Sequence, residues 1–240
     1  MKSLVLALAI CNKAIFVASQ NDSSHKPLWT NYRLKEIWVH HGCDDIMAIE
    51  RPLHNATTWN MLHEAYEDAV GKEKSSIHND PDNFEYLVEY DIRQTKDKGR
   101  GVFAKTFIPK GTLMYDFRRS AQFFSAPSYR QFLMSIRADL ACDVMIWAYL
   151  FKFQNNNTDI DEYSIYGEYS MMVDLDEGSF CNDGYDEANA GWDKSRGWES
   201  NYNRMPLIYS LRDINPGEEI LCSYSEFSYD SDETFKVFGL

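Results

Sequence analysis

The spacing of hydrophobic and polar residues divides the chain into a short N-terminal part and a longer part built from brief apolar runs. Within residues 57–70, apolar side chains recur at intervals of three and four, which predicts an amphipathic helix. Gly71 ends that pattern, and residues 72–83 are charged and rich in turn formers, as expected of a linker. We therefore expect an N-terminal extension with one helix over residues 20–84, followed by the main domain.

Beyond residue 84 the apolar runs are short and separated by turn-forming residues. Alternation and β-prone side chains predict strands over residues 84–90, 101–107, 112–117, 163–175, 206–212 and 219–224. Residues 91–98 and 176–203 are polar and predict loops, whereas residues 129–153 have helical spacing and predict one or two buried helices. This order favours a mainly β fold with inserted helices over a repeated βαβ unit.

The first nineteen residues differ from the rest of the chain. Lys2 precedes an apolar run that is interrupted at residues 11–13, and small residues precede Gln20, a pattern that resembles a cleavable signal peptide. The run is shorter than the roughly 20 apolar residues that span a bilayer, so no membrane span is expected. If residues 1–19 act as a leader, the chain enters the secretory pathway or an organelle; otherwise it is cytoplasmic or nuclear.

Composition narrows the classes of partner. Hydrophobic residues make up 44% of the 240 residues, enough for a folded core. Acidic side chains outnumber basic ones by 37 to 24, and the formal net charge is −13. Because such a surface repels phosphates, direct binding of nucleic acid is not expected, whereas a lysine-rich protein segment would be attracted.

The cysteines do not form a recognisable metal-binding pattern. Cys11 lies within the leader, and the four cysteines at positions 43, 142, 181 and 222 are too scattered for a dense disulfide framework. The nearest approach to a zinc site is the run from His40 to Cys43, which lacks the second ligand pair that tetrahedral zinc needs. We expect no metal.

Three segments stand out by their order and spacing: KGRGVFA with IPKGT at residues 98–112, VDLDEGSFCND at residues 173–183, and IYSLRDINPGEEI running on to CSY at residues 208–224. Together they resemble the SET domain family over residues 85–228. The resemblance implies a SET-type β-clip of short strands, with a helical insertion at about residues 127–153 between the first two segments. Residues 229–240 then form an aromatic C-terminal tail.

The same resemblance implies a site for S-adenosylmethionine. The turn formed by Gly99, Arg100 and Gly101 would contact the methionine portion of the cofactor, since glycine lets a backbone approach a ligand closely. Asn182 matches the family's cofactor-binding asparagine, and its amide is both donor and acceptor. Tyr224 matches the family's catalytic tyrosine and would also contact the cofactor. The chain has no GxGxxG motif that would indicate a dinucleotide-binding fold instead.

The implied activity is transfer of a methyl group from S-adenosylmethionine to a lysine amine of a protein substrate, which the acidic composition suggests is basic. Only a neutral amine can attack, and free lysine has a pKa of about 10.4. A narrow apolar channel beside a positive sulfonium disfavours the ammonium form, and a tyrosine hydroxyl and backbone carbonyls then align the amine.

The sequence departs from the family pattern at two positions and leaves a third open. Asp183 stands where the family usually has histidine, which keeps open an alternative: a SET-fold binding or interaction module with weak or no catalysis. Cys222 stands where some members carry an aromatic residue that limits methylation, so its smaller side chain predicts more than monomethylation. Tyr163, Tyr166 and Tyr169 are candidates for a second active-site tyrosine.

Overall fold

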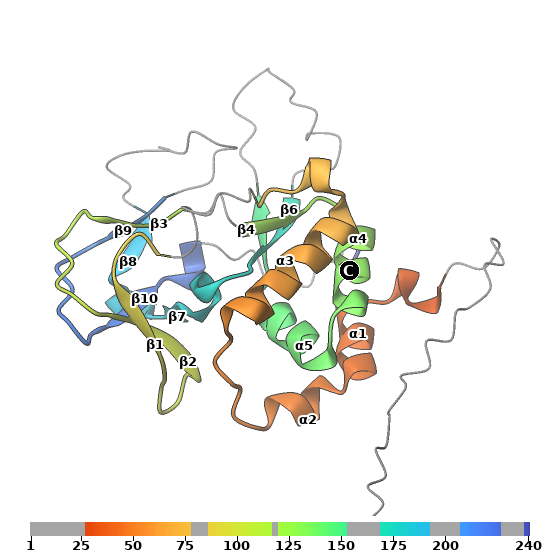
Figure 1. Cartoon of the computed structure of the whole chain (residues 1–240), viewed down its shortest axis with the longest axis horizontal. Coiled ribbons are helices and arrows are strands. Elements are labelled where there is room, and N and C mark those ends of the chain that lie inside the picture. The colour runs from red at the N-terminus through yellow and green to blue at the C-terminus, as the bar shows by residue number, and fades with distance from the viewer. Residues whose placement is uncertain (1–26, 78–85, 117–119, 153–168, 193–206, 227–237) are drawn as a thin grey trace, which may run out of the picture.

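The computed structural model describes residues 27–77, 86–116, 120–152, 169–192, 207–226 and 238–240 (Figure 1). Among the features expected from the sequence, the leader at residues 1–19, Tyr163 and Tyr166 lie outside these residues, as does most of the aromatic tail. Helices occupy one half of the molecule and most of the strands occupy the other. No helix in the described part is both long and apolar enough to cross a bilayer.

Five α-helices are described: α1 (Leu34–His41), α2 (Cys43–Met47), α3 (Ala56–Val70), α4 (Ala126–Ser135) and α5 (Ala138–Trp147). Helix α3 is the amphipathic helix predicted from the sequence. Helices α1 and α2 were not predicted, so the expectation of a single helix in residues 20–84 is wrong. Both are too short to show a clear period, and Gly42, in a left-handed conformation with φ of 67°, separates them.

Helix α3 is defined by local chemistry at both ends and by burial along one face. The Asn55 side-chain oxygen accepts a hydrogen bond from the backbone N–H of Thr58 at 3.0 Å, which caps the first turn. The buried face consists of Trp59, Leu62 and Tyr66. Trp59 packs against Trp147 and Phe180, and Tyr66 packs against Phe123. Helix α3 also contacts α4, while α1 and α2 pack against α5. The N-terminal helices and the two inserted helices therefore form one helical layer.

Within the residues that the structure describes, short strands form three sheets. The strands are β1 (Tyr90–Gln94), β2 (Arg100–Ala104), β3 (Leu113–Asp116), β4 (Ser120–Phe123), β5 (Tyr149–Lys152), β6 (Tyr169–Asp174), β7 (Asn182–Asp183), β8 (Ala190–Trp192), β9 (Leu207–Ser210) and β10 (Glu219–Cys222). The sheet orders are β1-β2-β10-β7, β3-β9-β8 and β4-β6-β5. Every pairing is antiparallel except that of β10 with β7.

Several predicted segments need correction. The strand predicted over residues 84–90 is misplaced, because β1 begins at Tyr90 and runs through residues predicted to be a charged loop. As an edge strand of the described sheet, β1 leaves its side chains half-buried or exposed, so polar residues suit it. The end of the predicted helical insertion, Tyr149–Lys152, is β5, which pairs with β6. Strand β4 was missed, and the predicted loop over residues 176–203 contains β7 and β8.

A disulfide joins the N-terminal helices to the insertion. Cys43, at the start of α2, is bonded to Cys142 in α5, and the two positions are separated by 99 residues in sequence. Both residues are fully buried. The bond removes Cys43 from consideration as a metal ligand beside His40 and His41.

We expect the double variant Cys43→Ser/Cys142→Ser to be less stable than the wild type. Losing a native disulfide costs about 2–5 kcal/mol, and in a chain of this size 1 kcal/mol corresponds to about 2–4 °C in the melting temperature. A thermal melt followed by circular dichroism should therefore show a drop of at least several degrees. An unchanged melting temperature would contradict the pairing.

Candidate functional site

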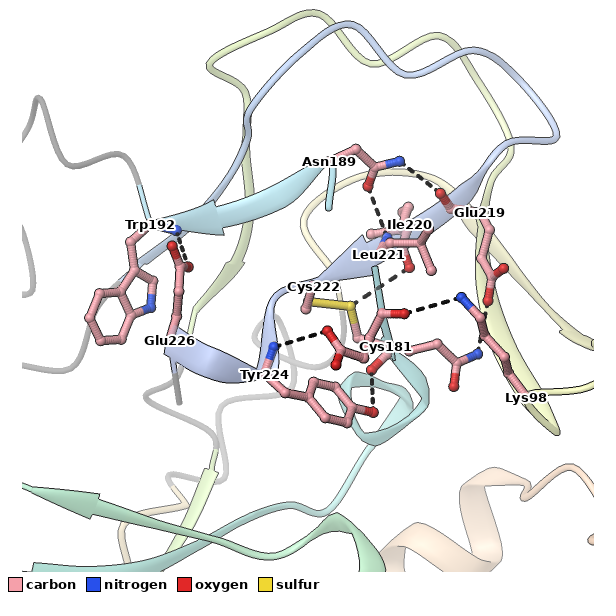
Figure 2. The surroundings of a disulfide bond; sticks show 12 residues. Lys98, Cys181, Asn189, Trp192, Glu219, Ile220, Leu221, Cys222, Tyr224 and Glu226 are labelled. Carbon is pink, nitrogen blue, oxygen red and sulfur yellow. Dashed lines mark hydrogen bonds between the residues drawn. A yellow bond between two sulfur atoms is a disulfide. The ribbon is translucent and has the colours of Figure 1, made fainter. Parts of the chain in front are cut away.

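The predicted site residues meet where β10 lies between β2 and β7. Strand β10 pairs antiparallel with β2 and parallel with β7, which places Leu221 opposite Asn182 and Cys222 opposite Asp183. Three segments that are far apart in the sequence thus become neighbours: the glycine turn, the Asn182–Asp183 strand and the chain leading to Tyr224. Figure 2 shows this corner of the molecule.

The glycine turn closes the hairpin between β1 and β2. Thr95 Oγ1 accepts a hydrogen bond from the backbone N–H of Lys98 at 2.9 Å, and Gly99 follows with a left-handed φ of 74°. A Cβ on Gly99 would meet nothing within 4 Å, whereas one on Gly101 would lie 2.6 Å from Glu219 Oε1. Gly99 therefore leaves open space beside the turn, and Gly101 permits a close approach of two strands.

Asn182 links the glycine turn to β10. Its Nδ2 donates to the backbone carbonyl of Arg100 at 2.9 Å and to Glu219 Oε1 at 2.8 Å. Both amide hydrogens are used, so the side-chain oxygen Oδ1 is the atom with which Asn182 can accept a hydrogen bond from a ligand. The Arg100 side chain points away from this corner and is buried against Asp143.

Asp183, the departure from the family's histidine, has a structural role here. Its Oδ1 accepts hydrogen bonds from the backbone N–H groups of Tyr185 and Tyr224, at 3.1 Å and 3.3 Å. Its backbone carbonyl accepts one from Lys98 Nζ at 3.1 Å. The carboxylate thus holds the backbone of Tyr224 next to β7, in a way that a histidine ring would not reproduce.

Tyr224 lies just beyond β10, at the start of a 3-10 turn (Tyr224–Glu226). Its hydroxyl donates to the backbone carbonyl of Cys181 at 3.0 Å (Figure 2). Burial of this end of the side chain, with smaller contributions from Asp183 and Tyr185, raises its pKa to about 12. The residue is nevertheless 46% exposed. Tyr224 is therefore a neutral phenol, with its hydrogen engaged and part of its ring open to solvent.

A second disulfide lies close to Tyr224. Cys181, which precedes β7, is bonded to Cys222 at the end of β10 (Figure 2). The prediction of more than monomethylation rests on Cys222 having a smaller side chain than an aromatic residue. Its sulfur is bonded to Cys181, and the degree of methylation stays a prediction. No group of three or more potential ligands placed to hold a metal occurs among the described residues.

A buried group of phenols and carboxylates adjoins Tyr224. The Tyr115 hydroxyl donates to Asp176 Oδ1 at 3.0 Å. Burial first, and then the charges of Asp176 and Asp174 and the proximity of Tyr224, raise the pKa of Tyr86 well above its ordinary value. We call Tyr86, Tyr115, Asp174 and Asp176 the phenol–carboxylate group. Of the three tyrosines proposed from the sequence, the described one, Tyr169, lies on the face of β6 opposite Asp174 by strand alternation.

Asn189 is another residue that the sequence did not reveal. It is fully buried, its Nδ2 donates to the carbonyl of Glu219 at 2.8 Å, and its Oδ1 accepts from the N–H of Leu221 at 2.9 Å. One side chain thus supplies two hydrogen bonds to the backbone of β10, as a neighbouring strand would. The only sequence signal is an asparagine within a polar segment, which predicts a loop.

Replacing Gly101 with alanine should damage the corner more than the same change at Gly99. The added methyl group at Gly101 would overlap Glu219 and approach Asn182 Nδ2 to 3.1 Å, whereas at Gly99 it meets only backbone strain. Overpacking costs about 1–3 kcal/mol. Thermal melts should show a drop of several degrees for Gly101→Ala. Nuclear magnetic resonance should show a shift of the Asn182 amide signal for Gly101→Ala but not for Gly99→Ala; equal effects of the two variants would contradict this geometry.

Stability should fall as the pH rises because of Asp174. Burial and the charge of Asp176 raise its pKa to about 7, so between about pH 4 and pH 7 the folded state retains a proton that the unfolded state has lost. Asp174→Asn keeps a neutral donor and acceptor for Ser120, whose hydroxyl bonds to Asp174. Its melting temperature relative to the wild type should therefore rise more at pH 8 than at pH 5. Asp186→Asn, at an exposed site, is the control; no pH-dependent difference for Asp174→Asn would contradict the assignment.

Comparisons with known proteins bear on the whole arrangement. The SET domain family model matches residues 99–225, and no curated protein matches the chain. Among solved structures, the chain is similar to the Neurospora SET domain protein DIM-5, a histone lysine methyltransferase. That match has 18% identity and a TM-score of 0.39, and it covers 58% of this chain and 53% of the other. CpSET8 from Cryptosporidium matches with 15% identity and a TM-score of 0.36, over 86% and 84% of the two chains.

The chain thus spans about half the length of the Neurospora protein, and the structural scores are too low to transfer individual residues from one protein to the other. The family model is more informative, because it covers more than half of the chain and includes all three predicted segments of the site. Small antiparallel sheets with inserted helices are the architecture that it implies. The chain belongs to the SET domain family.

Proposed function

We propose that this chain is a protein-lysine N-methyltransferase that uses S-adenosylmethionine, with Tyr224 as its catalytic residue. The observation that carries the proposal is the meeting of the glycine turn, Asn182 and Tyr224 around β10. SET domain proteins are typically lysine methyltransferases, and S-adenosylmethionine, when bound, supplies a methyl group on a positively charged sulfur.

The residues around the turn suit the two ends of an amino acid. Lys98 Nζ offers a positive charge beside the turn, and the Glu219 carboxylate offers a negative one. Asn182 Oδ1 is placed to accept a hydrogen bond, since both hydrogens of its amide are engaged. Gly99 leaves the adjoining space open to a ligand. We therefore assign residues 99–101, with Asn182 and Tyr224, to cofactor binding.

Tyr224 is suited to orient an amine. Because its hydroxyl hydrogen is donated to the Cys181 carbonyl, its oxygen presents lone pairs that can accept an N–H from a neutral lysine side chain. With a pKa of about 12, the phenol stays protonated and does not act as a general base at neutral pH. Its contribution is positioning, which aligns the nitrogen lone pair for attack.

We also assign the phenol–carboxylate group, which adjoins Tyr224, to the side of the site that would receive the lysine. Asp174 has a pKa of about 7, so it is partly protonated near neutral pH. A group that titrates in this range is suited to take up the proton that a lysine ammonium must lose. The substrate in this proposal is a lysine-containing protein segment, attracted by the acidic composition of the chain.

Tyr224→Phe should lower the rate of methyl transfer by at least a hundredfold. Cofactor binding should change much less, because the variant keeps the ring assigned to cofactor contact and loses only the hydroxyl assigned to the lysine. Purified protein is incubated with radiolabelled S-adenosylmethionine and fractionated cell protein, and cofactor affinity is measured in parallel by calorimetry. Tyr32→Phe, which removes a hydroxyl from a half-buried tyrosine in the N-terminal part, is the control and should match the wild type.

The outcomes of this experiment separate the proposal from its alternative. Equal labelling by the wild type and Tyr224→Phe would refute the role of Tyr224. Cofactor binding without transfer to any protein fraction would indicate a SET-fold binding module that has lost turnover. Absence of cofactor binding would overturn the proposed function as a whole.

A further inference from the structure

A buried charge cluster lies behind the glycine turn. Asp143, in the middle of α5, is fully buried, and its carboxylate is surrounded by three side chains: Arg51, His54 and Arg100. Arg100 donates from Nη2 to Oδ1 at 2.9 Å and from Nη1 to Oδ2 at 3.1 Å. Arg51 donates from Nε and Nη2, each at 3.2 Å, and His54 Nε2 lies 2.9 Å from Oδ2. We call these four residues the Asp143 cluster.

The cluster is strongly constrained by its charges. Burial alone would raise the pKa of Asp143, but hydrogen bonds from His54, Arg100 and Arg51 outweigh it and hold that pKa well below its usual range. The carboxylate is therefore ionised at neutral pH. Removing a partner from a buried carboxylate is strongly destabilising, because it leaves an unpaired charge in an apolar environment.

Aromatic rings enclose the cluster. The Arg100 guanidinium lies 5.1 Å from the ring centre of Trp147 and 4.6 Å from that of Phe180. The His54 ring meets the rings of Trp59 and Trp147 edge to face. These rings restrict the orientation of the Arg100 guanidinium. Its paired N–H groups face Asp143, and the aliphatic part of the side chain leads back to the turn.

In the Gly99–Gly101 turn, Arg100 is the residue with a side chain that other residues can fix in place. It stands between Gly99 and Gly101, neither of which has a side chain. Its backbone carbonyl accepts the hydrogen bond from Asn182, and its guanidinium also donates to the carbonyl of Pro52 at 3.1 Å. One end of Arg100 is thus part of the proposed cofactor site, and the other end is fixed by Asp143.

The opposite side of the site is tied to the same cluster. Phe180, which lies against the Arg100 guanidinium, is two residues before Asn182. Helix α5 is itself fixed, because Cys142, the neighbour of Asp143, is bonded to Cys43 in α2. Both segments proposed to bind the cofactor are therefore placed relative to one carboxylate on the inserted helix.

We propose that Asp143 is a positioning residue that sets the place of the Gly99–Gly101 turn, so that the N-terminal segment around Arg51 and helix α5 belong functionally to the cofactor site. This inference rests on the proposed function for its effect on S-adenosylmethionine, but not for its effect on the turn itself. Asp143 touches no proposed ligand and acts through Arg100.

The test compares Asp143→Asn with Asp139→Asn. Asp139 lies one turn earlier on the same helix and also faces Arg51, at 3.8 Å, but it makes no contact with Arg100. Asp143→Asn should raise amide hydrogen exchange at least tenfold in residues 95–102 of the cofactor-free protein, with little change in α3. It should also weaken binding of S-adenosylmethionine at least tenfold, measured by calorimetry. Asp139→Asn should change neither quantity.

Arg100→Lys provides a second variant if Asp143→Asn does not fold. It keeps the charge but loses the two-pronged contact with Asp143 and the flat stacking surface, so it should show the same local pattern to a smaller degree. Unchanged exchange at residues 95–102 would overturn the proposal, as would a uniform rise across the whole protein, which indicates general destabilisation. If the wild type itself binds no cofactor, the proposed function fails, while a local rise in exchange still supports the positioning role.

Discussion

The parallel pairing of β10 with β7 is the constraint on which the candidate site depends. It joins two short segments about forty residues apart and is reinforced by the bond between Cys181 and Cys222. Two residue pairs make a weak ladder by themselves, so side chains complete it. Asn189 supplies hydrogen bonds to the backbone of β10, and Asp183 accepts one from the backbone of Tyr224. This pairing is what brings Asn182 close to Tyr224.

The segments with strong local signals were predictable from the sequence. Helix α3 follows from its period and its glycine stop, and the three family segments led to the glycine turn, Asn182 and Tyr224, which the fold brings to one corner. The sequence did not indicate which strands pair with each other. Strand β1 has polar residues because it is an edge, and an edge strand resembles a charged loop when its partner is unknown.

The residues missed by sequence analysis share a physical cause. Asp143 lies in a mostly apolar helix, and its importance comes from hydrogen-bonding side chains contributed by segments 43 to 92 positions away. Tyr86 gains its environment from carboxylates on β6 and on the turn after it. Such groups form no sequence motif, because their members are far apart in the chain and none of them is distinctive by itself. Long-range electrostatics becomes visible only when the chain is folded.

The two ends of the candidate site differ in how rigidly they are held, and this difference has a functional meaning. Behind the glycine turn, paired charges and aromatic rings are buried, so the proposed cofactor side would be set in advance of binding. Tyr224, by contrast, is 46% exposed; its hydroxyl donates to the Cys181 carbonyl, and its backbone N–H donates to the Asp183 carboxylate. The net charge of −13 attracts a basic segment toward such an opening, but physiological salt screens exposed charges beyond about 8 Å. In the proposed function, general acidity can therefore speed the encounter without selecting a lysine, and selection would have to come from side chains that contact the substrate around Tyr224.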